Sequence, residues 1–153
     1  HEVTTEGGLD ILAQEARLQT VIARLADAGI VTSVFIDADT EQVEAAARIG
    51  ARVCEIHTGP YAHAFHAAGR DHESAAVQVE LERVARAGAA VRALGMRFNA
   101  GHALNYYNVQ PVAALPGVRE LHIGHAIVSR AVFTGLTAAV REMKQLMREA
   151  ARI

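Results

Sequence analysis

Apolar residues follow two periods that alternate along the chain. Between residues 9 and 28 they recur at helical spacing, and one face is formed by Leu18, Val21, Ile22 and Leu25, which predicts a helix. Residues 30–36 form a short β-branched and aromatic run, which is typical of a buried strand. The alternation continues and predicts further strands at 52–57, 96–100 and 119–123, and further helices at 41–49, 77–91, 108–115 and 136–150.

Short strands that alternate with longer helices indicate βαβ units and a parallel sheet, so the predicted class is α/β. No low-complexity segment or Pro-rich linker interrupts the pattern, and residues 1–153 are interpreted as a single domain. Two architectures are compatible with the pattern, an open doubly wound sheet and part of a (β/α)₈ barrel. A whole barrel needs about 250 residues, so four strand–helix units would supply about half of one. The periodicity alone does not separate these options.

Two segments depart from this simple order. The last predicted helix has the most regular apolar stripe, which includes Leu136, Val140 and Met143, and this stripe is predicted to be core. Residues 61–72 have no clear period and contain three histidines, close after His57. His63 and His66 are three residues apart and would suit a metal on a helix, but the pattern favours a solvated His-rich loop.

Composition narrows the function classes. Half of the 153 residues are hydrophobic (51%), and the 15 basic and 17 acidic residues give a net charge of −2. This balance offers no electrostatic footprint for nucleic acid or an acidic membrane surface. The single cysteine, Cys54, excludes an internal disulfide and a Cys-based zinc cluster, and is expected to pack as a small apolar side chain. It also fits a reducing, cytoplasmic setting.

The chain ends add two expectations. No apolar run approaches the roughly 20 residues that span a bilayer, and residues 1–5 lack the basic-then-apolar order of a signal peptide. The sequence starts without methionine, as if it were cut from a longer protein.

Polar residues follow the predicted strands at the ends where ligands bind in parallel α/β folds. Glu55 and His57 are two apart and therefore face the same way on their strand. His102 and His125 each follow a glycine at a strand tip, Gly101 and Gly124. Asp37 and Asp39, after the first strand, are interpreted as turn and cap residues.

The residues at these strand ends are candidates for phosphate binding and proton transfer. An interior Glu55 is costly to bury without a partner, so it is a candidate for catalysis or for binding a polar substrate; a structural salt bridge to an arginine is the alternative. Gly124-His125 before a helix is typical of a phosphate-binding turn, or of a simple strand-to-helix turn. His102 could then transfer a proton to a phosphorylated substrate, or serve as a structural, hydrogen-bonded histidine.

Several motifs, in order, resemble the pyridoxine 5′-phosphate synthase family over essentially the whole chain. They are residues 2–10 (EVTTEGGLD), 24–30 (RLADAGI), 34–39 (VFIDAD), 55–59 (EIHTG), 99–102 (NAGH) and 123–127 (IGHAI). The resemblance implies a (β/α)₈ TIM barrel of which this chain supplies about the last four strand–helix units, assembled as a homo-octamer. It further implies condensation of 3-amino-2-oxopropyl phosphate with 1-deoxy-D-xylulose 5-phosphate to pyridoxine 5′-phosphate, phosphate and water, in vitamin B6 biosynthesis, without metal or cofactor.

The resemblance also assigns roles to individual residues. His102 matches the proton donor, and Glu55 matches a carboxylate that stabilises the transition state. Thr4 matches a contact to 1-deoxy-D-xylulose 5-phosphate. The 3-amino-2-oxopropyl phosphate site would be formed by Ala103, where the family usually has glycine, together with Gly124 and His125.

Part of the family's site has no counterpart in these 153 residues. An early Asn-Asp-His motif, a second catalytic histidine, a basic contact and the glutamate general base are missing. The segment by itself is therefore expected to be inactive.

Two rival interpretations come from other classes. A flavodoxin-like binding module would need a glycine-rich phosphate loop after its first strand, where residues 37–39 read Asp-Ala-Asp. A different phosphate-binding barrel enzyme such as an aldolase would need a Schiff-base lysine at a strand tip, whereas the one lysine, Lys144, belongs to the last predicted helix.

Overall fold

A computed structural model describes residues 7–151. Its centre is a four-stranded parallel sheet in which the strands lie in chain order, β1-β2-β3-β4. A doubly wound sheet reverses its order at a switch point, and this sheet has no reversal. The strands are therefore wound in one direction, as in a partial TIM barrel, and the predicted parallel α/β architecture is confirmed. The strands are β1 (Ser33–Ile36), β2 (Val53–His57), β3 (Arg97–Gly101) and β4 (Val118–His122).

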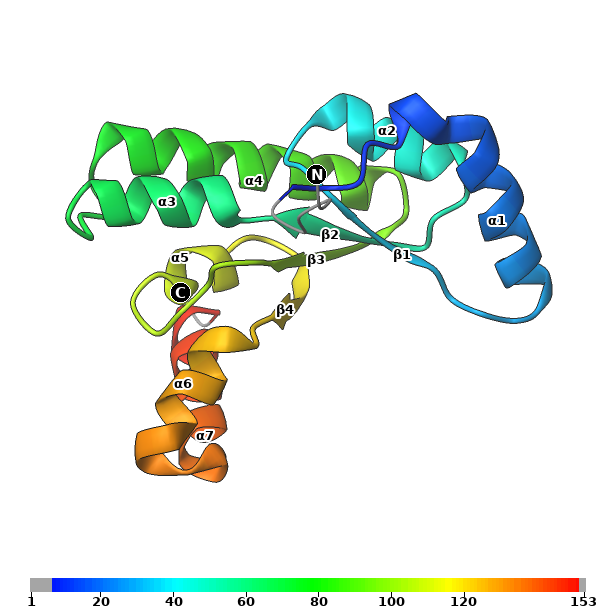
Figure 1. The fold of residues 1–153 in the computed structure, drawn as a ribbon. Coiled ribbons are helices and arrows are strands. Elements are labelled where there is room, and N and C mark those ends of the chain that lie inside the picture. The colour runs from blue at the N-terminus through cyan, green and yellow to red at the C-terminus, as the bar shows by residue number, and fades with distance from the viewer. Residues whose placement is uncertain (1–6, 152–153) are drawn as a thin grey trace, which may run out of the picture.

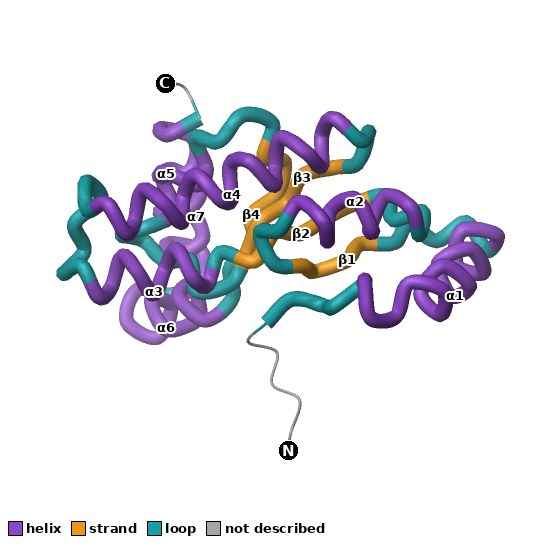
Figure 2. Tube along the Cα trace, turned by 90° about the horizontal axis from the view of Figure 1, so that it is seen from above, coloured by secondary structure: helices purple, strands orange, loops and turns teal. Residues whose placement is uncertain are grey.

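Helices connect the strands and lie outside the sheet (Figures 1 and 2). Figure 2, the view from above, shows α2 and α4 lying over the strands, and α2 contacts β1 while α4 contacts β2 and β3. The helices α6 and α7 pack on each other and project away from the rest of the sheet beyond β4 (Figure 1). The elements are η1 (Leu12–Gln14), α1 (Glu15–Asp27), α2 (Thr40–Arg48), α3 (Gly59–Ala67), α4 (Ala75–Ala93), α5 (Val109–Ala113), α6 (His125–Thr134) and α7 (Leu136–Ala150).

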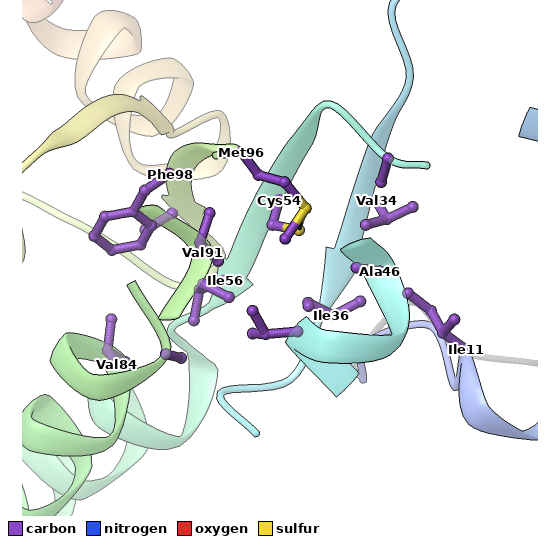
Figure 3. Close-up of a cluster of buried hydrophobic side chains, with 14 of the residues drawn as sticks. Ile11, Val34, Ile36, Ala46, Cys54, Ile56, Val84, Val91, Met96 and Phe98 are labelled. Carbon is purple, nitrogen blue, oxygen red and sulfur yellow. Dashed lines mark hydrogen bonds between the residues drawn. The ribbon is translucent and has the colours of Figure 1, made fainter. Parts of the chain in front are cut away.

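The hydrophobic core fills the space between the sheet and the helices α2, α3 and α4 (Figure 3). Every second strand residue points into it, and Ile36, Ile56 and Phe98 are fully or almost fully buried there. Cys54 lies beside Met96, with 3.6 Å between the two sulfur atoms. Burial raises the pKa of the Cys54 thiol to about 12, so it stays protonated near neutral pH. The expected apolar role of this cysteine is confirmed.

Phe98 depends on a glycine in the helix above it. A Cβ atom at Gly88 would collide with the Phe98 ring, so the ring occupies the space that any other residue on α4 would fill. Both residues are buried, and this contact locks α4 onto β3.

The predicted loop over residues 61–72 is wrong, because the segment begins with helix α3. Pro60 lies in its first turn, where the missing N–H is no loss. Tyr61 and Phe65, one turn apart, are both buried, and α3 packs against α4. Only two large apolar residues mark the buried face, which is too few to show a period in the sequence.

The apolar stripe of α7 is only partly core. Ala139 and Met143 are buried, whereas Leu136 is 60% and Val140 36% exposed. The reason is that α7 packs on α5 and α6 and not broadly over the sheet.

The predicted cap at Asp39 is confirmed. Asp39 caps α2, where its side chain accepts a hydrogen bond from the backbone N–H of Glu41 (2.8 Å). No helix in residues 7–151 is long and apolar enough to cross a membrane.

Candidate functional site

On β2, β3 and β4, the face of the sheet opposite the core carries polar side chains. Because side chains alternate along a strand, the residues between the core positions all point to this second face. Glu55 and His57 lie on β2, Asn99 on β3, and Glu120 and His122 on β4. The predicted common direction of Glu55 and His57 agrees with this alternation. In a barrel this face is the interior, where polar groups persist when they pair with one another or with a ligand.

Glu55 forms the shortest contact on this face. Its Oε2 lies 2.6 Å from Nδ1 of His122, and its side chain is only 18% exposed. Nε2 of His122 lies 3.6 Å from Glu120, which in turn accepts a hydrogen bond from the Asn99 amide (3.2 Å). Glu55 therefore pairs with a histidine and not with the arginine that was its structural alternative. Held in this way, the carboxylate presents one oriented group to whatever occupies the interior.

One residue of this arrangement, His122, was not identified from the sequence. It repeats the Glu-x-His spacing of Glu55 and His57 through Glu120, and this pattern could have drawn attention to it. Gly101 was noted as a glycine at a strand tip, but its role beside Glu55 was not predicted: a Cβ there would collide with Glu55 Oε1. The missing side chain at Gly101 leaves the space in which the Glu55 carboxylate sits.

His102 and Ala103 follow β3 in a left-handed backbone conformation, with φ of 83° and 58°. This region disfavours residues with a Cβ by roughly 1–2 kcal/mol each, which explains why a glycine would suit position 103. The turn places His102 just beyond the end of β3, where it lines a cavity together with Glu55.

Gly124 ends the connection after β4 and is the N-terminal cap residue of α6. Nothing lies within 4 Å of the position that its Cβ would take, so the approach to it is open. The free N–H groups of the first turn of α6 and the positive end of its dipole are suited to an anion. The sequence-based expectation of a glycine turn before a helix is confirmed here.

These pieces surround one cavity of about 570 Å³ at the C-terminal ends of the strands. The structure thus brings together five of the six predicted site residues, Glu55, His102, Ala103, Gly124 and His125, with His122 beside them. Thr4, the sixth, lies outside the described residues. A carboxylate, several imidazoles and a helix N-terminus in one cavity are chemically suited to bind a phosphorylated compound and to move protons at it.

Asp37 lies outside this cavity. Its Oδ1 accepts hydrogen bonds from the Gly8 N–H (2.9 Å) and from Nδ1 of His57 (2.9 Å). It is therefore more than the turn residue that the sequence suggested, since it ties together β1, β2 and the segment before η1.

A metal site receives no support from the described part of the chain. No group of three His, Cys, Asp or Glu side chains in residues 7–151 is arranged to hold an ion. His63 and His66 are exposed on α3. The His72 ring instead packs on the Phe65 ring, with 4.5 Å between the ring centroids. Lys144 is exposed on α7 and does not line this cavity.

Comparison with known proteins adds a family to this geometry. Residues 1–149 match the family described as pyridoxal phosphate biosynthesis protein PdxJ. The whole chain is 82% identical to a pyridoxine 5′-phosphate synthase from Aromatoleum aromaticum, and 151 residues are 79% identical to one from Dechloromonas aromatica. A third, from an Azoarcus species, is 78% identical over 151 residues. The chain spans 61%, 60% and 61% of the lengths of these relatives, respectively.

Proposed function

Because the chain belongs to the PdxJ family of pyridoxal phosphate biosynthesis proteins, we propose that the complete protein containing it is a pyridoxine 5′-phosphate synthase. It condenses 3-amino-2-oxopropyl phosphate with 1-deoxy-D-xylulose 5-phosphate and releases pyridoxine 5′-phosphate, phosphate and water. The observation that carries the proposal is the single cavity in which Glu55, His102 and the Gly124 turn meet.

The proposed chemistry requires imine formation, loss of a phosphate and repeated proton transfers. His102 is the proton donor, since it lies at the cavity and follows the strand end where a substrate would bind. Glu55 stabilises positive charge that develops during ring closure, and its bond to His122 keeps the carboxylate in one orientation. Ala103, Gly124 and His125 bind 3-amino-2-oxopropyl phosphate, while Thr4 contacts the second substrate.

Phosphate is expected to bind at Gly124 and His125 in preference to Asp37 and Asp39. The turn offers backbone donors and a helix N-terminus, whereas the aspartates repel an anion. Titration of inorganic phosphate into the ¹⁵N-labelled complete protein should shift the amide signals of residues 124–126. Shifts confined to Asp37 and Asp39 would refute this assignment.

The activity itself is tested in a complete protein, obtained by joining this chain to the part of the 82% identical Aromatoleum aromaticum relative that it does not cover. With both substrates present, mass spectrometry should detect pyridoxine 5′-phosphate and a colorimetric assay should detect released phosphate. Reactions that lack one substrate are the control. A folded protein that yields no product from the pair would overturn the proposal.

Two properties of the complete protein are part of the same proposal. It assembles with copies of itself into a homo-octamer, and its other partners are small phosphorylated substrates. It works in the cytoplasm, a setting that accords with a single cysteine, Cys54, which is free.

A further inference from the structure

Beyond the residues that face the cavity, we propose that Thr58 and the Asp37–His57 pair are positioning residues that hold the catalytic His102 in its reactive orientation. This inference rests on the proposed function, because it assigns the residues by what they do to His102. It concerns two separate parts of that residue, its backbone and its ring.

The backbone of His102 needs an external restraint. Its φ of 83° lies in the left-handed region, and Ala103 with φ of 58° continues it. Two consecutive residues with a Cβ do not adopt this conformation without interactions that compensate for its cost. Relaxation of either residue would move the His102 side chain away from the end of β3.

Thr58 supplies that restraint from the neighbouring strand end. Its hydroxyl oxygen lies 2.6 Å from the carbonyl oxygens of both Gly101 and His102, and its single proton is shared between these two acceptors. Its backbone N–H donates to Gly101 as well, at 2.8 Å. Thr58 is completely buried, so water does not compete for these bonds. The hydroxyl therefore fixes the peptide groups on both sides of the His102 Cα atom.

The ring of His102 is restrained by a second histidine. The rings of His57 and His102 meet edge to face, with 4.8 Å between their centroids. The centroid of the Phe35 ring lies 5.1 Å from that of His57 and 6.0 Å from that of His102. These aromatic neighbours limit the rotations that are open to the His102 ring.

His57 is itself held in one orientation. Nδ1 bonds to the Asp37 carboxylate at 2.9 Å, and its side chain is only 6% exposed. Nε2 is buried with no hydrogen-bond partner in the described residues, in a space kept open because Gly59 has no Cβ. A substrate in the cavity cannot reach this nitrogen. His57 is therefore placed to orient His102 and not to exchange protons itself.

The backbone restraint is tested in the complete protein with Thr58→Val and Thr58→Ser. Valine keeps the shape but removes the hydroxyl, whereas serine keeps the hydroxyl. We expect Thr58→Val to lower kcat by about 10- to 100-fold, the loss caused by a displacement of about 1 Å, with little change in either KM. Thr58→Ser should restore most of kcat. A Thr58→Val protein with a kcat within about threefold of the parent would overturn this restraint.

The ring restraint is tested with Asp37→Ala and Asp37→Asn, which are informative even if the buried Thr58 variants fold poorly. The Asp37 side chain is 57% exposed, so these changes leave the core intact. Asparagine keeps an oxygen that accepts from His57, and alanine does not. We expect Asp37→Ala to lower kcat about tenfold and to shift the NMR signals of the His102 ring. Asp37→Asn should do neither. If both variants have the kcat of the parent protein and the His102 ring signals do not move, the role of the pair is overturned.

The two proposals fail in different ways. An inactive parent protein contradicts the proposed function, whatever the variants do. An active parent whose variants are equally active leaves the synthase function in place and removes the positioning roles.

Discussion

Replacement of His102 by alanine in the complete protein is expected to lower the rate of pyridoxine 5′-phosphate formation by about 10²–10⁴, the usual contribution of a positioned general acid. The reason is that His102 lines the cavity and is held in place by two buried residues. Thr58 binds its carbonyl oxygen, and the His57 ring packs against its ring. The measurement is steady-state kinetics with both substrates at saturation. The loss should be in kcat, because the turn at Gly124, which we propose to bind phosphate, is unchanged.

A matched control is available on α3. His63→Ala removes an exposed histidine outside the cavity and should leave kcat unchanged. If His102→Ala retains full activity while it is folded, His102 has no part in the mechanism, and its positioning residues lose their role as well.

The largest effect on stability is expected from Phe98→Ala. Phe98 is 1% exposed and fills the space above Gly88, so that truncation leaves a cavity between β3 and α4. Removal of a buried phenylalanine side chain typically lowers the free energy of unfolding by about 3–5 kcal/mol. Denaturant unfolding followed by circular dichroism should show a lower midpoint at an unchanged m-value.

The control for this change is Leu94→Ala at the end of α4. Leu94 is 46% exposed, so its truncation removes little buried surface and should cost less than about 1 kcal/mol. Equal losses of stability in the two variants would show that the contact between Phe98 and Gly88 does not lock the helix onto the sheet.

The order of strands and helices could be predicted from the sequence because each element carries its own period. β-branched runs at 30–36 and 52–57 and the apolar face of α4 are local properties of the chain. Candidate site residues could be found for a related reason. His102 and Gly124 follow the C-terminal ends of β3 and β4, Glu55 lies two residues before the end of β2, and parallel strands bring those ends to the same edge.

Packing could not be predicted where the local signal is small or where the partner is distant in the chain. Helix α3 has only Tyr61 and Phe65 as large buried residues, so its period is hidden. The stripe of α7 is regular, yet its burial depends on which elements lie beside it, and Leu136 is exposed as a result. Periodicity shows which residues share a face but not what covers that face.

The partners of the site residues were decided by strand register. The pairing of β3 with β4 shifts between Phe98 and Asn99, so that Phe98 pairs with Val118 but Asn99 pairs with Glu120. A shift of one residue moves every later side chain to the other face. It places His122 opposite Gly101, on the same face as Glu55, where His122 Nδ1 lies 2.6 Å from Glu55 Oε2.

The sequence by itself determined which chemical groups stand at or near the strand ends, and the tertiary structure decided that Glu55 pairs with His122 and that Thr58 holds His102. The physical reason is that these contacts join residues 44 to 67 positions apart, whose meeting depends on register and winding and not on local period.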